Sequence, residues 1–233
     1  MSVIPTPDAR LLSAIPYLKK GGTVADVGTD HAYLPIYLVL EGYAQSAVAS
    51  DVNRGPILSA EANIAAAGLS ERIKAIQTDG LHGIEVYAPD DVLIFGMGGE
   101  LIIRILQEAP WIKNERVTLV LQAMSRIHLL RKWLTENGFS ICGESLTDER
   151  KFYQTICARY DGVGESYTEE ELLLGKRNLE LHPPLFEGFV RHELAVHQRI
   201  LDGKRQAVAS DCADVLRVVE FLKKRLETSH ENS

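Results

Sequence analysis

Cysteine is scarce in this chain. Its three cysteines, Cys142, Cys157 and Cys212, are odd in number, widely separated and without a CxxC spacing. That pattern excludes a disulfide framework and a thiolate zinc site, so we expect no bound metal. Small, buried thiols are typical of proteins in a reducing compartment, which predicts a cytoplasmic location.

Long apolar runs are also absent. No stretch of the sequence approaches the roughly 20 apolar residues that a membrane-spanning helix requires. Residues 1–10 (MSVIPTPDAR) lack the basic start and apolar core of a signal peptide. We therefore expect neither a membrane partner nor secretion.

Positive charge is in short supply, because the formal net charge is −7. That balance argues against a large non-specific nucleic-acid surface, since such surfaces neutralise many phosphates. Local basic clusters remain, and one of them contains Arg126, His128, Arg131 and Lys132. This cluster is either a phosphate-binding patch or an ordinary solvated helix face.

What the chain does contain is a regular alternation of apolar strand-like and helical segments. Its 233 residues are 45% hydrophobic, which suffices for one large core and a smaller appendage. The segments that predict strands followed by helices are 23–27, 47–51, 73–78, 92–95 and 117–121. Residues 139–146 and 152–160 have no helix between them and predict an antiparallel hairpin. Together these segments predict an α/β fold with a doubly wound, mostly parallel, seven-stranded Rossmann-like sheet.

The composition changes near Val163. Beyond it the sequence is poor in strand-like runs, Pro183 and Pro184 interrupt it, and apolar residues recur at helical spacing in two long stretches. Two such helices bury their apolar stripes when they fold back on each other. We therefore predict a sheet domain at residues 1–162 and an antiparallel, coiled-coil-like helical domain at residues 163–233.

Acidic and glycine residues recur where the predicted strands end. They are Asp26 with Gly28, Asp51, Asp79 with Gly80, and the run from Gly96 to Gly99. Open α/β sheets bind ligands at the carboxyl ends of their strands, so this edge predicts a ligand site. Turn geometry explains the glycines, but it does not explain three like charges along one edge.

The turn after the first strand has one glycine, Gly28, where a dinucleotide fingerprint has three, which disfavours a nicotinamide oxidoreductase. Asp51 follows Gly28 by about 20 residues, the position from which an acid accepts bonds from the ribose hydroxyls of an adenosine ligand. Asp79 either accepts a bond from an adenine amino group or forms an Asx turn with Gly80. The bare backbone at Gly96 is either an approach for two ligands or a tight turn.

Four segments and the helical tail together resemble the bacterial tRNA (adenine-22-N1)-methyltransferase family, TrmK. The segments are residues 24–35 (VADVGTDHAYLP), 49–53 (ASDVN), 79–81 (DGL) and 95–99 (FGMGG). The resemblance implies a class I methyltransferase domain that uses S-adenosyl-L-methionine (SAM), followed by a coiled-coil-like helical domain. It also implies a tRNA partner and methylation of N1 of adenine 22.

The resemblance assigns roles to residues at the predicted edge. The expected SAM-binding residues are Asp26, Gly28, His31, Asp51, Val52, Asp79, Gly80 and Gly96. The expected substrate-binding residues are Met97, Gly98, Arg126 and Arg131. Asp30 is the candidate catalytic residue, because the methylated adenine ring gains positive charge and a nearby carboxylate stabilises it.

Other functions are compatible with the same residues. A SAM-dependent enzyme could act on another RNA site or on a small molecule, and the helical tail argues against the small molecule, because small substrates rarely need such a tail. A non-catalytic RNA-binding protein would not need the three acids Asp26, Asp51 and Asp79. We expect a monomer rather than an oligomer.

Overall fold

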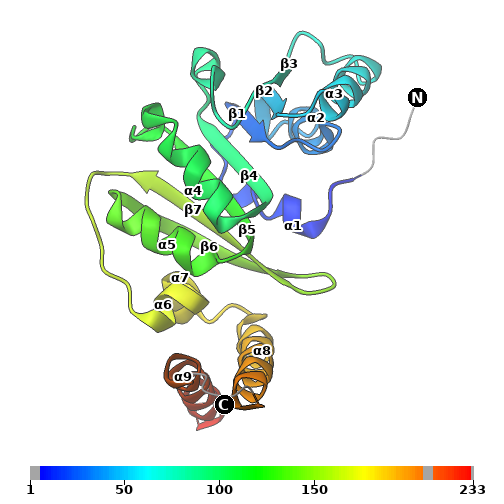
Figure 1. Cartoon of the computed structure of the whole chain (residues 1–233). Coiled ribbons are helices and arrows are strands. Elements are labelled where there is room, and N and C mark those ends of the chain that lie inside the picture. Colours follow the sequence, from blue (N-terminus) through cyan, green and yellow to red (C-terminus); the bar gives the residue numbers. More distant parts are fainter. Residues whose placement is uncertain (1–5, 207–211, 232–233) are drawn as a thin grey trace.

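The computed structural model describes residues 6–206 and 212–231. Its centre is a seven-stranded sheet with the strand order β3-β2-β1-β4-β5-β7-β6 (Figure 1). The first five strands are parallel, and β7 runs antiparallel to both β5 and β6. The strands are β1 (Gly22–Val27), β2 (Ala44–Asp51), β3 (Ile73–Gln77), β4 (Asp91–Gly98), β5 (Thr118–Ser125), β6 (Phe139–Asp148) and β7 (Phe152–Tyr160). The predicted seven-stranded, mostly parallel sheet with its terminal hairpin is confirmed.

Helices cover both faces of the sheet and extend beyond its β6 edge. They are α1 (Ala9–Leu12), α2 (Tyr33–Leu40), α3 (Arg54–Ala66), α4 (Gly99–Gln107), α5 (Ile127–Glu136), α6 (Glu169–Leu174), α7 (Lys176–Leu181), α8 (Phe186–Gln206) and α9 (Ala213–Glu231). None of the helices formed by residues 6–206 and 212–231 combines the length and apolar character needed to cross a bilayer.

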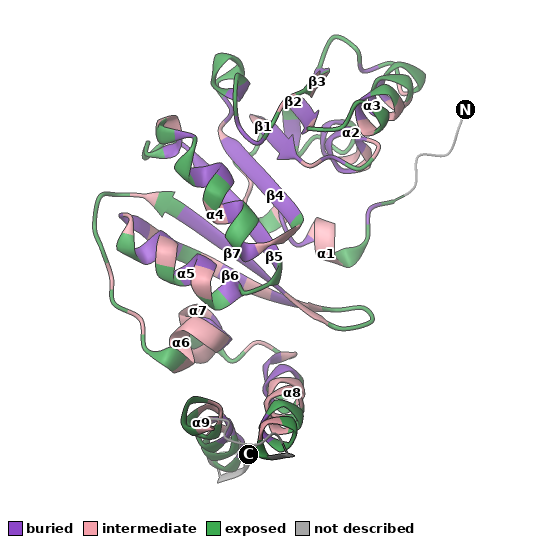
Figure 2. Ribbon diagram, in the orientation of Figure 1, coloured by how far each residue is buried: buried purple, intermediate pink, exposed green. Residues whose placement is uncertain are grey.

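The strands bury alternate side chains on opposite faces, because successive residues of a strand point to opposite sides. Val92 and Ile94 of β4 pack in the core under α4 and α5. Leu93 and Phe95 of the same strand pack in the core under α2 and α3. Figure 2 shows the resulting continuous buried layer through the central strands. The sheet is therefore rigid behind the edge where its parallel strands end.

Two of the five parallel strands, β4 and β5, end further along the chain than expected. β4 continues through Gly98, although the sequence predicts that it ends at Phe95, and β5 continues through Ser125. The register between the two strands shifts on either side of Met97. Glycines at 96 and 98 thus form an irregular strand end rather than a loop.

The C-terminal helices divide into two pairs. α6 and α7 contact α5 and β6, whereas α8 packs along α9 (Figure 1). A third apolar cluster, which includes Leu146, Leu174, Phe189 and Leu222, joins these helices to the hairpin. The predicted helical pair is confirmed. The division at residues 162/163 stays a prediction, and residues 1–5, 207–211 and 232–233 of its two ranges lie outside the described residues.

Candidate functional site

Two cavities lie at the carboxyl ends of the parallel strands and meet at Gly28. The smaller, about 100 Å³, is lined by residues that include Gly28, Asp51, Val52, Asp79, Gly80 and Met97. The larger, about 360 Å³, is lined by residues that include Arg10, Asp26, Gly28, Asp30, Tyr33 and Gly96. Nine of the residues predicted from the sequence therefore come together around one edge of the sheet.

Gly28 is required where the two cavities meet. Its φ of +77° is a left-handed conformation that favours glycine. A Cβ placed on it would lie 2.3 Å from Met97 Cε, so a side chain would fill the gap between β1 and β4. The backbone N–H groups of Gly28 and Thr29 both donate to the Ser50 carbonyl at 2.8 Å. The turn is thus fixed to β2 and leaves bare backbone facing the cavities.

The next turn holds Asp30 out toward solvent. His31 and Ala32 have φ values of 58° and 57°, which is strained for residues other than glycine. Asn63 Nδ2 donates to the His31 carbonyl at 2.9 Å and holds this conformation. The Asp30 side chain is 89% exposed, and its carboxylate lies 3.1 Å from His31 Nε2. His31 therefore orients the Asp30 carboxylate and is itself part of the turn.

Asp26 is buried beneath the larger cavity. Burial raises the pKa of Asp26 to about 6, and the nearby Asp30 carboxylate acts in the same direction. A carboxylate whose surroundings disfavour its charge is a ready partner for a cationic ligand group. Among the described residues, no group of three or more His, Cys, Asp or Glu side chains could hold a metal ion instead.

The smaller cavity combines two acids with exposed apolar side chains. Asp51 Oδ1 accepts the Asn53 backbone N–H at 2.7 Å, one of about four bonds that a carboxylate accepts. Asp79 lies 3.5 Å from Arg104 Nη2 in a half-exposed ion pair. Val52 and Leu101, which are 55% and 40% exposed, also line this cavity. Apolar walls with a few polar groups are the usual composition of a site for an organic ligand.

This chain is similar to known proteins in its sequence and in its fold. The Methyltransferase domain family matches residues 8–156. The tRNA (adenine(22)-N(1))-methyltransferase of Bacillus subtilis is 34% identical over 165 residues, which cover 67% of this chain and 69% of that protein. The chain belongs to this methyltransferase family. The resemblance predicted from the four sequence segments is thereby confirmed.

Solved structures of the family share the whole fold. The tRNA methyltransferase TrmK of Bacillus subtilis superposes with a TM-score of 0.76 at 28% identity, covering 97% of this chain and 98% of that one. A candidate tRNA adenine-22 methyltransferase of Streptococcus pneumoniae, in complex with SAM, superposes with a TM-score of 0.82 at 32% identity. It covers 94% of this chain and 99% of that one. The likeness therefore includes the C-terminal helices as well as the sheet.

From the sequence, Arg10 belongs to a basic cluster with Lys19 and Lys20 that is a candidate for holding RNA, and it has no predicted role at the strand ends, yet it reaches this methyltransferase site. Arg10 Nη1 donates to Gln122 Oε1 at 3.1 Å, and the same oxygen accepts the Gly96 N–H at 3.1 Å. Gln122 is buried within β5, three residues before the strand ends, and stands in the sequence directly after the apolar run 117–121. Arg10 lies in a short N-terminal helix, and no local pattern links it to strands more than 80 residues later.

The two predicted substrate-binding arginines have opposite surroundings. Arg126 is exposed at the turn after β5, 2.7 Å from Glu100. The prediction for Arg131 is wrong, because its side chain is fully buried and cannot reach a phosphate. Arg131 donates to Glu144 and Gln154, each at 2.7 Å. Arg131 follows Ile127 by four residues on the apolar face of α5, and this spacing is the signal that would have identified it as buried.

Gly98 lies beside the turn that carries Arg126. In the strand register Gly98 pairs with Ser125, and a Cβ on the following Gly99 would lie 2.6 Å from the Arg126 carbonyl. The β4–α4 and β5–α5 turns are therefore in close contact. This contact places Arg126 next to the strand end at Gly96 to Gly98, outside both cavities.

Proposed function

We propose that this protein transfers the methyl group of SAM to N1 of adenine 22 in tRNA. The observation that carries the proposal is the pair of cavities that meet at the bare backbone of Gly28, one with Asp51 and Asp79 and the other with Asp26 and Asp30. Membership in the tRNA (adenine(22)-N(1))-methyltransferase family supports the same reaction.

The residues present fit SAM. In the smaller cavity Asp51 would accept bonds from the ribose hydroxyls and Asp79 from the adenine amino group, with Val52 and Leu101 as apolar walls. In the larger cavity the carboxylate of Asp26 would meet the ammonium group. When bound, SAM supplies an electrophilic methyl group.

The remaining work of the protein is to position the substrate base. Adenine N1 carries a lone pair at neutral pH, so no strong base is needed and alignment contributes most of the rate. We propose that the base enters over Gly98, where the backbone is bare, and against the Met97 side chain, and that Asp30 stabilises the positive charge of the product ring. N1 lies on the Watson–Crick edge, so the base must be unpaired or flipped out of its helix.

The proposal also covers the contact with tRNA, the oligomeric state and the location of the protein. We propose Arg126 as a phosphate contact, because it is exposed next to the strand end that receives the base. We also propose that the protein acts as a monomer in the cytoplasm, as the sequence predicts.

Incubation with isotope-labelled SAM and an unmodified tRNA transcript, followed by nucleoside analysis, tests the reaction. We expect 1-methyladenosine, and we expect it to disappear when the transcript carries guanosine at position 22. Methylation that persists in that control would indicate another RNA site. Binding of SAM without any RNA methylation would favour a small-molecule substrate, and failure to bind SAM would favour a non-catalytic RNA-binding protein.

A further inference from the structure

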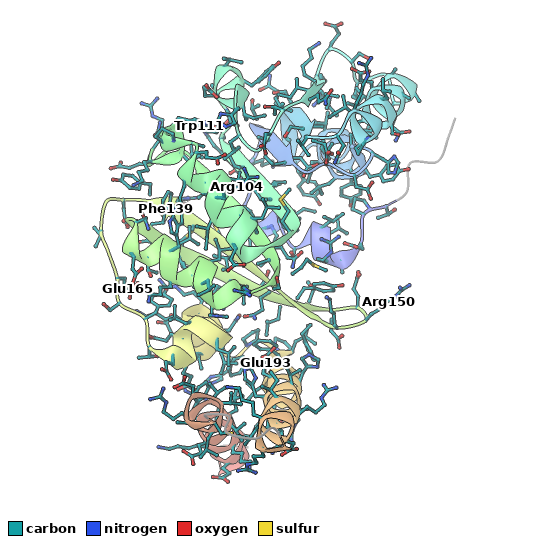
Figure 3. The ribbon with its side chains drawn as sticks, in the orientation of Figure 1. Arg104, Trp111, Phe139, Arg150, Glu165 and Glu193 are labelled. Atoms are coloured by element: carbon teal, nitrogen blue, oxygen red, sulfur yellow. The ribbon has the colours of Figure 1, made fainter. Side chains whose placement is uncertain are left out.

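A third cavity of about 390 Å³ separates the sheet domain from α8. Its walls are the β5–α5 turn at 124–128, the start of β7 at 151–154, and the face of α8 that carries Glu193 (Figure 3). None of its lining residues lines the two cavities at Gly28. We refer to this cavity as the interdomain groove.

The interdomain groove has an aromatic wall. The ring of Phe152 lies 5.9 Å from the ring of Phe189 and 5.6 Å from that of His192. Tyr153 also lines the groove, but its ring lies on the opposite face of β7, because successive residues of a strand point to opposite sides. Aromatic faces of this kind stack on nucleic-acid bases without regard to their sequence.

The rim of the groove is basic. Arg126 and Lys151 are both exposed there. The existing partner of Arg126 is Glu100, and because both side chains are more than half exposed, a phosphate would replace that carboxylate at little cost. Glu193 is the one acid among the described lining residues, and its carboxylate lies 3.6 Å from His197 Nδ1. The groove therefore attracts a phosphodiester although the whole chain is acidic.

Tyr153 connects the groove to the proposed methyl-transfer site. Lys151 Nζ lies 5.2 Å from the centroid of the Tyr153 ring, and Arg10 Cζ lies 5.7 Å from the same centroid. Arg10 lines the larger cavity at Gly28, whereas Lys151 lines the groove. The Tyr153 ring therefore lies between a residue of the larger cavity and a residue of the groove, so the two sites are neighbours.

We propose that the interdomain groove binds the nucleotide adjoining the target adenosine, with its phosphate on Arg126 and Lys151 and its base against the ring of Phe152. This inference rests on the proposed tRNA substrate. It gives α8 a defined role, because α8 forms one wall of the groove and thereby brings the helical domain into contact with the RNA next to the reacting base.

The test uses the full chain and a double variant, Arg126→Asn with Lys151→Ala. Asn tolerates the left-handed backbone at position 126, where φ is 54°. Lys74→Ala is the matched control, since Lys74 is an exposed cation of β3 near the end opposite the site. The tRNA affinity of each protein is measured between about 50 and 200 mM salt. SAM affinity is measured by calorimetry.

We expect the log–log salt slope of the double variant to be shallower by about 1.4 to 2, the share of two phosphate contacts. The KM for tRNA should rise while SAM affinity stays unchanged. The control should keep the wild-type slope. A wild-type slope in the double variant would overturn the proposal.

A cross-linking experiment locates the nucleotide itself. A tRNA with 4-thiouridine beside adenine 22 should cross-link to peptides that contain residues 151–154 or 189–197, and a tRNA with 4-thiouridine in the anticodon stem should not. Cross-links confined to other peptides would overturn the proposal. If the wild-type protein transferred no methyl group to tRNA, the proposed reaction would fail, while the slopes and cross-links would still decide whether the groove holds RNA.

Discussion

The strand-end site and the junction between α5, β6 and α6 both contain charged side chains, but the burial and pairing of those side chains differ. At the site, burial raises the pKa of Asp26, and the Asp30 side chain is 89% exposed. At the junction, the side chains of Arg131 and Glu144 are completely buried and paired. The buried pair connects elements of the fold, and breaking it leaves an uncompensated charge, whereas the carboxylates of the site keep acceptor capacity for a ligand.

The charged groups of the junction, Arg131 and Glu144, each have several hydrogen-bond partners among the described residues. Arg131 Nη1 donates to the carbonyls of Leu172 and Leu173 in α6, at 2.8 and 3.2 Å. The second oxygen of Glu144 accepts the Arg177 backbone N–H at the start of α7, at 2.9 Å. A Cβ on Gly175 would lie 2.5 Å from that oxygen, so only glycine permits this approach. The network therefore fixes α6 and α7 to the sheet domain.

Breaking the junction should produce the largest effect. Arg131→Met removes one partner of a fully buried pair and leaves the Glu144 charge uncompensated, which typically costs about 3–5 kcal/mol. Urea unfolding measures the loss. Lys132→Met is the matched control, because Lys132 is the adjacent exposed cation and its loss should change stability by less than about 0.5 kcal/mol. Equal stability of the two variants would contradict the contrast between the regions.

The sequence predicted the strand-end site because its signal is local. Asp51 and Asp79 each stand at the end of a strand-like segment, and parallel strands bring such ends to one edge. No local signal of this kind connects Gln122 with its partner Arg10, because α1 reaches this edge through tertiary contacts that leave no periodic pattern in the sequence. Local patterns therefore identified the acids of the site but did not place Arg10 there, although Arg10 lines its larger cavity.

The junction was mispredicted because residue type was given more weight than position. Arg131 lies with Ile127, Leu130 and Leu134 on the buried face of α5, yet its charge suggested a surface role. A charge at a core position indicates a buried partner, and here that partner, Glu144, comes from β6. The partner could not be predicted, since the pairing depends on how the hairpin packs beneath α5.

The second prediction concerns the site itself. Asp51→Ala should weaken SAM binding at least about 100-fold, because it removes two charge-assisted bonds of about 1.5–3 kcal/mol each. Asp51→Asn keeps an acceptor for the Asn53 N–H at 2.7 Å and isolates the effect of the charge. Calorimetry with SAM measures both variants. Unchanged affinity in Asp51→Ala would place the ribose elsewhere.

The third prediction uses the raised pKa of Asp26. A folded-state pKa of about 6 against an ordinary 3.8 means that Asp26 favours folding fully below about pH 4 and loses that contribution as the pH rises through 6. Asp26→Asn should therefore gain about 2–3 kcal/mol in free energy of unfolding relative to the wild type between pH 4 and 7. Urea unfolding across this range measures the difference.

The same substitution, Asp26→Asn, should weaken SAM binding, because it removes the charge of the Asp26 carboxylate. SAM affinity of the wild type should fall as the pH drops below about 6, because the protonated Asp26 no longer attracts an ammonium group. Asp26→Asn should bind SAM weakly at every pH. A wild-type affinity that is constant from pH 5 to pH 8 would show that Asp26 does not meet the charge of the ligand.

The smallest expected effect distinguishes the role of Asp79 from that of its ion-pair partner Arg104. Arg104 lies 3.5 Å from Asp79, and both side chains are about half exposed, so Arg104→Ala should change stability by less than about 0.5 kcal/mol. Asp79→Ala should be equally harmless to the fold but should weaken SAM binding by about 1 kcal/mol, roughly fivefold, since one hydrogen bond to an adenine amino group is lost. Thermal unfolding and calorimetry of the two single variants measure these differences. If Asp79→Ala left SAM affinity unchanged while Arg104→Ala lowered it, Asp79 would serve the turn with Gly80, and Arg104 rather than Asp79 would be the ligand contact in this cavity.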